Sequence, residues 1–181
     1  MREEQKIRER LSQGNRRWQQ RTDEQAARRL DTARNGQRPY AIVIACADSR
    51  VIPEQIFDTG LGELFVIRVA GNVLDQHQLG SVEYAAGHLD CRKIVLLGHT
   101  GCGAVEAALH GGGDGFIRYI TDEILFAVGE ERDPLRACEK NVEYGVEILR
   151  REFAAHPEIA SEDLEILGAV YELETGAVHW L

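Results

Sequence analysis

Residues 40–50 read YAIVIACADSR and residues 93–103 read KIVLLGHTGCG. Each stretch opens with a continuous apolar run rich in β-branched residues, which is typical of a strand buried on both faces of a parallel sheet. Each run is followed at once by residues that carry chemistry: Cys46, Asp48 and Arg50 in the first, His99 and Cys102 in the second. This layout indicates a site, because ligands of parallel sheets bind beyond the carboxyl ends of the strands.

The rest of the chain alternates similar runs with helical patterns. Strands are predicted over residues 40–45, 64–69, 93–98 and 164–173, with a short edge strand over 178–181. Helices are predicted over residues 2–13, 22–34, 79–89, 102–109, 116–128 and 134–155. The last helix starts at Asp133-Pro134, an N-cap followed by proline at the first helical position. The pattern predicts an α/β fold with a central, mostly parallel sheet: four parallel strands and a C-terminal edge strand, flanked by helices, with an N-terminal helical arm.

The composition limits the possible functions. With 181 residues, 44% of them hydrophobic, the chain is long enough for one domain with a sizeable core, and its net charge is −9. An acidic protein is a poor match for nucleic acid as a main partner. No apolar run approaches the roughly 20 residues of a membrane span, and the N-terminus has no apolar signal region. We therefore expect a cytoplasmic protein with no membrane association, whose four cysteines are buried residues or functional thiolates and not two disulfides.

The charge is unevenly distributed. Residues 1–38 hold 11 basic and 6 acidic side chains, whereas residues 39–181 hold 10 and 24. The two N-terminal helices have too few apolar residues to be stable alone. An Arg-rich arm of this kind either grips RNA or lies on an acidic neighbour, and the second interpretation is favoured. Residues 1–36 are thus predicted to be an arm that packs on a partner subunit, and residues 37–181 to be a single α/β catalytic domain.

The residues after the two decisive strands can form a metal site. If the strands are neighbours, Cys46, His99 and Cys102 converge at one point. Two thiolates and an imidazole suit Zn²⁺ and leave one tetrahedral position open, while sulfur donors disfavour Mg²⁺ and Ca²⁺. The plainer alternative is that these cysteines are ordinary buried residues. Asp48 lies close enough to bind the same metal, or to pair with Arg50 instead.

The motif CADSR followed by HTGCG closely resembles the β-class carbonic anhydrases. The similarity continues through residues 51–72, 80–89 and 168–181, so that it covers nearly all of residues 37–181. It implies zinc-dependent, reversible hydration of carbon dioxide to bicarbonate and a proton, by attack of zinc-bound hydroxide. In this resemblance Cys46, His99 and Cys102 match the zinc ligands. Asp48 and Arg50 match a dyad in which the carboxylate orients the zinc-bound water and the arginine holds the carboxylate; in some members the Asp instead binds the metal and closes the site.

The resemblance also implies a substrate pocket of the plant-like subgroup. Gln37 and the amide of Gly103 match groups that bind substrate oxygen, and Phe65 and Tyr84, together with Val43, would line an apolar wall. His88, four residues after Tyr84, is a candidate proton relay. Part of the wall comes from a partner subunit in this family, so a homodimer or a dimer-based higher oligomer is implied. Val43 stands where the bicarbonate-inhibited subgroup has tryptophan.

Two other functions are compatible with the same motifs. The chain could be a catalytically silent zinc-binding relative that acts as a bicarbonate sensor or assembly subunit, although the intact Asp48–Arg50 pair argues against silence. It could also be an enzyme of the same fold that hydrolyses CS₂ or COS.

Overall fold

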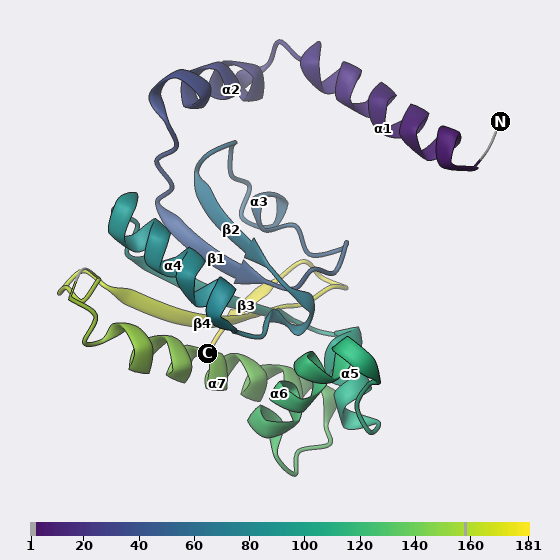
Figure 1. The fold of residues 1–181 in the computed structure, drawn as a ribbon, viewed down its shortest axis with the longest axis vertical. Coiled ribbons are helices and arrows are strands. Elements are labelled where there is room, and N and C mark those ends of the chain that lie inside the picture. The colour runs from purple at the N-terminus through teal and green to yellow at the C-terminus, as the bar shows by residue number, and fades with distance from the viewer. Residues whose placement is uncertain (1–2, 158) are drawn as a thin grey trace.

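The computed structural model describes residues 3–157 and 159–181, and it contains the expected central sheet with helices packed against it (Figure 1). The strand order is β2-β1-β3-β4-β5. The strands are β1 (Ala41–Ala45), β2 (Leu64–Arg68), β3 (Lys93–His99), β4 (Glu165–Tyr171) and β5 (Val178–Trp180). The first four are parallel and β5 is antiparallel to β4, which confirms the predicted fold class. The decisive strands β1 and β3 are direct neighbours.

The longer predicted helices are present, with bounds shifted by a few residues. The α-helices are α1 (Glu3–Gln19), α2 (Glu24–Asn35), α3 (Pro53–Ile56), α4 (Gln76–His88), α5 (Gly103–Leu109), α6 (Arg118–Val128) and α7 (Pro134–Phe153). Two 3₁₀ turns, η1 (Ala70–Asn72) and η2 (Gly115–Ile117), complete the set. The predicted N-cap of α7 is confirmed, since the Asp133 carboxylate accepts from the backbone N–H of Arg136. The short elements α3, η1 and η2 were not predicted.

The first helix is longer than predicted. The predicted helix ended at residue 13, with residues 14–21 as a connecting stretch, but α1 continues through Gly14 to Gln19. A mid-helix glycine costs only about 1 kcal/mol relative to alanine. Side-chain hydrogen bonds one turn apart support the helix on both sides of it, from Gln13 to Glu9 at 2.8 Å and from Gln19 to Asn15 at 2.6 Å. Residue 2, the predicted first helical residue, lies outside the described residues.

The two faces of β1 contact different parts of the chain, because successive side chains of a strand point in opposite directions. Ile42 and Ile44 face a large cluster that includes residues of α4 and α7. Val43 and its neighbours on the other face pack against Val51 and residues of α3. Every residue of β1 is buried, as the apolar run predicted. A third cluster, formed by α5, α6 and the start of α7, contains Cys46 and Cys102 and so encloses the carboxyl end of β1.

The N-terminal helices make few contacts with the rest of the chain. None of the residues of α1 is buried, and Figure 1 shows this helix extending away from the sheet. Helix α2 is tied to the loop before β2 by an ion pair of 2.9 Å between Arg28 and Glu63 and by a hydrogen bond from the Leu61 amide to Gln25. Among the described residues, no helix is both long and apolar enough to cross a bilayer.

Candidate metal centre

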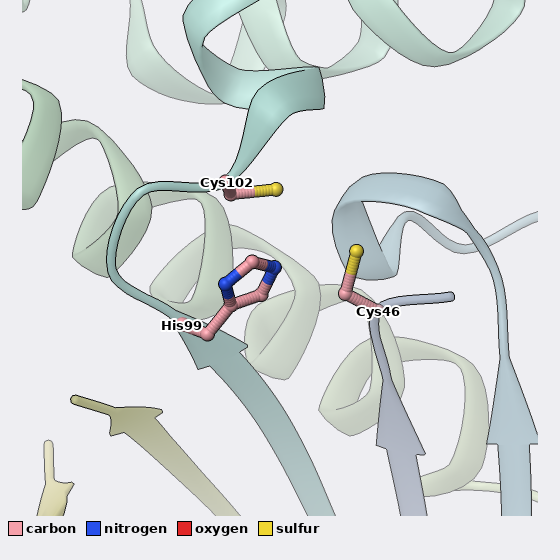
Figure 2. Close-up of side chains that lie close together, drawn as sticks. All are labelled: Cys46, His99 and Cys102. Atoms are coloured by element: carbon pink, nitrogen blue, oxygen red, sulfur yellow. The ribbon is translucent and has the colours of Figure 1, made fainter. Parts of the chain in front are cut away.

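Three potential metal ligands meet where β1 and β3 end. Cys46 directly follows β1, and His99 is the last residue of β3. Cys102 is the N-cap of α5, which begins one residue later than predicted. Figure 2 shows the two sulfur atoms and the imidazole turned toward a common space. One ligand atom from each residue lies within 4.8 Å of the others, and all three side chains are buried. The parallel pairing of β1 with β3 brings them together across 53 residues of sequence.

The hydrogen bonding of His99 leaves one ring nitrogen free to bind a metal. Its Nδ1 lies 3.0 Å from the carbonyl oxygen of Thr100. Because a carbonyl only accepts, this contact assigns the ring proton to Nδ1 and a lone pair to Nε2. Nε2 is buried and has no hydrogen-bond partner among the described residues. An unpartnered buried nitrogen beside two sulfur atoms is costly unless a cation binds there, so the donor set fits zinc.

The two cysteines have opposite tendencies to ionise. The Cys102 thiol beside it lowers the pKa of Cys46 to about 4, and backbone N–H groups of Asp48 and Gly71 donate to the Cys46 sulfur at 3.4 and 3.3 Å. The pKa of Cys102 is raised, because its proton is shared with Cys46 and because it is buried. Without metal the pair therefore holds one thiolate and one thiol, and a metal ion that binds both sulfur atoms displaces the remaining proton.

Asp48 and Arg50 form an ion pair at the edge of this group. The Arg50 Nε donates to Asp48 Oδ1 at 3.0 Å, and Nη2 donates to Oδ2 at 2.7 Å. Such bidentate arginine–carboxylate contacts are among the stronger ion pairs in proteins. Nη2 also donates to the Gly101 carbonyl at 3.3 Å. These bonds from Arg50 hold the pKa of Asp48 well below its usual range. The carboxylate is ionised and lies 4.0 Å from His99 Nε2.

The proposed substrate residues are more dispersed in the single chain. Gly103 begins α5, next to Cys102, and Val43 is the central residue of β1, buried in the core with only 1% of its surface exposed. Gln37 is exposed in the segment between α2 and β1. None of these three is brought into hydrogen-bonding contact with the ligand group within the described residues.

Phe65, Tyr84 and His88 form a row of rings. The ring centroids are 6.2 Å apart for Phe65 and Tyr84 and 5.2 Å apart for Tyr84 and His88. Tyr84 is 48% exposed. Within the described part of the chain, these ring contacts do not extend to Cys46, His99 or Cys102.

One residue of the site was missed by the sequence reasoning. Arg68, at the end of β2, donates to the carbonyl of Cys46 at 3.0 Å and to that of Asp48 at 2.5 Å. It therefore fixes the backbone that carries one ligand and the carboxylate. A charged residue at the carboxyl end of an otherwise apolar strand was the signal that could have found it.

A family model described as carbonic anhydrase matches residues 41–178. The chain belongs to the carbonic anhydrase family. It is 42% identical over 152 residues to carbonic anhydrase 2 of Mycobacterium tuberculosis, which covers 78% of this chain and 73% of that relative. Among solved structures, the β-carbonic anhydrase CafA of Aspergillus fumigatus is similar with a TM-score of 0.85 and 26% identity, over 97% of this chain and 90% of that one.

The resemblance to the β-class that the motifs suggested is thereby confirmed. A tetrameric β-carbonic anhydrase of Sordaria macrospora is also similar, with a TM-score of 0.77 and 28% identity, over 98% of this chain and 97% of that one. Carbonic anhydrases of the β-class use zinc to hydrate carbon dioxide, and the group of Cys46, His99 and Cys102 is suited to that metal. The comparisons give no support to a silent sensor or to a CS₂ or COS hydrolase.

Proposed function

We propose that Cys46, His99 and Cys102 hold the zinc ion of this carbonic anhydrase, and that Asp48 and Arg50 direct the hydration of carbon dioxide beside it. The observation that carries this assignment is the convergence of three buried ligand atoms within 4.8 Å of one another, next to an ionised carboxylate. Bound zinc supplies a nucleophile at neutral pH, because it lowers the pKa of water to about 7.

Asp48 orients the attacking water. An ionised carboxylate only accepts hydrogen bonds, so Asp48 Oδ2, 4.0 Å from His99 Nε2, can accept the O–H of that water. The remaining lone pair of the water oxygen is then directed toward the carbon of carbon dioxide. Preorganised groups of this kind are typically worth about 10²–10³ in rate.

Arg50 keeps Asp48 in that position. With zinc held by the three ligands, an unpaired Asp48 carboxylate could itself bind the metal and would then occupy the coordination position that the reaction needs. The two hydrogen bonds from Arg50, and the anchoring of Arg50 by the Gly101 carbonyl, favour the arrangement in which Asp48 is paired with Arg50 and does not bind the metal. Asp48 is a metal ligand only in a closed state in which this pair is broken.

The substrate groups complete the site. The Gly103 N–H, at the start of α5, and the Gln37 side chain bind the developing bicarbonate oxygen. Phe65 and Tyr84 provide an apolar wall for carbon dioxide, whereas Val43, only 1% exposed within β1, has no free surface to line it. His88 lies beside Tyr84 of this wall and is the group proposed to pass the released proton to solvent. The exposure of Gln37 and Tyr84 in the single chain is consistent with a site that a second copy completes.

The assembly is a dimer or a larger oligomer built from dimers. Support comes from α1, which has no buried residue although Ile7 and Leu11 are 57% and 70% exposed. Such apolar positions on a helix are expected to be covered by another chain. The tetrameric Sordaria relative is compatible with a dimer-based assembly. Zinc binding needs Cys46 and Cys102 to stay reduced, which supports a cytoplasmic location.

Stopped-flow measurement of carbon dioxide hydration, with zinc analysis on the same sample, tests the proposal. We expect one zinc per chain, rapid hydration, and a fall of about 10²–10³ in rate for Asp48→Asn with zinc retained. Asp122→Asn is the control, because Asp122 is an exposed carboxylate that pairs with Arg118 and is not one of the proposed site residues. Full activity of Asp48→Asn would contradict the assignment of Asp48. Zinc binding without turnover would make the sensor interpretation correct, and consumption of COS in place of carbon dioxide would favour the hydrolase.

A further inference from the structure

Asn141 is a buried polar side chain in the middle of α7. It is only 5% exposed, and its Nδ2 donates to the carbonyl of Gly71 at 2.9 Å. The two residues are 70 positions apart in sequence. A buried amide on a face that packs against an apolar cluster is costly unless it is hydrogen-bonded, and an apolar side chain would fill the space without that requirement. The hydrogen bond to Gly71 is therefore the reason for a polar side chain at this position.

Gly71 is one step away from the metal ligands. Its backbone N–H donates to the sulfur of Cys46 at 3.3 Å. The residue has a left-handed conformation, with φ +67° and ψ +14°. A Cβ atom at this position would lie 2.8 Å from Ile124 Cδ1 and 3.1 Å from Ala104 Cβ. The site therefore needs glycine here, for its backbone conformation and for the close packing of α5 and α6 around it.

We propose that Asn141 is a positioning residue that holds Gly71 in place, so that the Gly71 N–H stays on the Cys46 sulfur and the zinc ion is held tightly. The carbonyl that Asn141 binds and the N–H that reaches the sulfur belong to peptide groups on opposite sides of the Gly71 α-carbon. Asn141 therefore acts by fixing the position of Gly71 and not by polarising the N–H group itself.

The effect on the metal follows from the role of N–H groups around a thiolate. Hydrogen bonds to a ligating sulfur orient it and share its negative charge, and loss of such an outer partner typically weakens metal binding about 10–100-fold. Removing the Asn141 amide leaves the buried carbonyl of Gly71 without its donor. A glycine in a left-handed turn has many alternative conformations, so the turn is expected to relax and to withdraw its N–H from Cys46.

The test compares Asn141→Leu, which keeps the approximate size of the side chain and removes the donor, with Thr121→Val. Thr121 is a matched control, since it is also fully buried and hydrogen-bonded, to Gly113 and Ile117, but it has no bond to a metal ligand or to Gly71. Zinc release from the holoenzyme to a coloured chelator gives the metal dissociation rate. The cobalt-substituted protein gives a second readout, because its sulfur-to-cobalt charge-transfer bands report the environment of the ligating thiolates, of which Cys46 is one.

We expect Asn141→Leu to weaken zinc binding about 10–100-fold and to shift the charge-transfer bands. Thr121→Val should lower the unfolding temperature without changing either readout. Wild-type zinc release and wild-type bands in Asn141→Leu would overturn the proposal, as would equal changes in Thr121→Val, which would indicate general loosening of the fold. If Asn141→Leu does not fold, the smaller Asn141→Ser variant is measured in the same way and must show the same two changes.

The inference rests on Cys46 being a zinc ligand, as proposed above. Cys46→Ser tests that premise separately, because it should reduce the charge-transfer bands to those of Cys102 alone. A Cys46→Ser protein with unchanged bands would mean that the ligand assignment is wrong. A changed Cys46→Ser protein together with an unchanged Asn141→Leu protein would mean that the ligand is right and the role of Asn141 is wrong.

Discussion

The guanidinium of Arg50 binds both oxygens of Asp48, with Nε 3.0 Å from Oδ1 and Nη2 2.7 Å from Oδ2. The Arg50 side chain is 58% exposed whereas that of Asp48 is 18% exposed. Asp48 and Arg50 lie two and four residues after Cys46 in sequence, and the pair lies at the edge of the ligand group in space. In the proposed function, the state of this pair controls whether the carboxylate faces the substrate or binds the metal.

Replacing Arg50 with alanine should therefore cost most of the activity. Without the guanidinium, the pKa of Asp48 returns toward its usual range and the carboxylate is free to bind zinc. We expect hydration to fall about 10²–10³-fold, as for other preorganised groups, with zinc content unchanged. Arg118→Ala removes an exposed arginine from a comparable ion pair and serves as the control in stopped-flow assays. Wild-type turnover in Arg50→Ala would show that Asp48 is held by other groups.

The metal-free protein should contain one thiolate at neutral pH. The pKa of Cys46 is lowered to about 4, first by the neighbouring Cys102 thiol, so Cys46 is ionised above that pH and protonated below it. Thiolate absorbance near 240 nm, measured on folded metal-free protein, should fall as the pH drops through about 4. Cys102→Ser should move this titration, and Cys46→Ser should abolish it. A titration that starts only above pH 8 would contradict the coupling of the two sulfur atoms.

The grouping of Cys46, His99 and Cys102 could be predicted from strand geometry. Two neighbouring parallel strands that end at the same edge of a sheet place the residues that follow them close together. The roles of the remaining site residues stay predictions. The contact between Gly71 and Asn141 could not be predicted in this way. It depends on a left-handed turn at Gly71 and on the packing of α7 against a segment 70 residues earlier in the sequence. Short elements such as α3 carry too few residues for a periodic signal.

The close packing of α7 on β3 leaves no room for a side chain at Gly98, beside the site. A Cβ added to Gly98, the residue before His99, would lie 2.6 Å from Val142 Cγ2. Gly98→Ala should therefore destabilise the protein by about 1–3 kcal/mol, the usual cost of overpacking. Combining it with Val142→Ala, which removes the clashing methyl group, should recover part of that loss. Urea unfolding measures both. Gly80→Ala is the control, since nothing lies within 4 Å of the added methyl group, and it should stabilise α4 by about 0.5–1 kcal/mol.

If the N-terminal arm (residues 1–36) packs on a partner subunit, assembly and activity should be linked. Deleting residues 1–34 removes α1 and most of α2, and with them the apolar positions proposed to cover a partner. Sedimentation should show loss of a dimer whose interface exceeds about 1,200 Å², together with reduced hydration. Leu11→Glu should weaken the dimer, whereas Gln13→Glu, which adds the same charge at an exposed polar position on the opposite face of the same helix, should not. An intact and fully active dimer after the deletion would show that the arm has another role.

Bicarbonate should not inhibit this enzyme cooperatively. The bicarbonate-inhibited subgroup of the β-class has a tryptophan at the position of Val43. In that subgroup the tryptophan is part of a bicarbonate pocket, which stabilises the closed site in which the Asp binds the metal. Val43 is 1% exposed and packed among apolar residues of the sheet, so it offers neither an N–H donor nor space for an anion. Hydration rates measured against increasing bicarbonate near pH 7.5 should fit simple inhibition with a Hill coefficient of about 1, since no second state is selected. A sigmoidal loss of activity, or an Asp48 oxygen within about 2.0–2.2 Å of zinc in crystals grown at that pH, would mean that the closed state is the stable one and that the Asp48–Arg50 pair breaks when zinc binds.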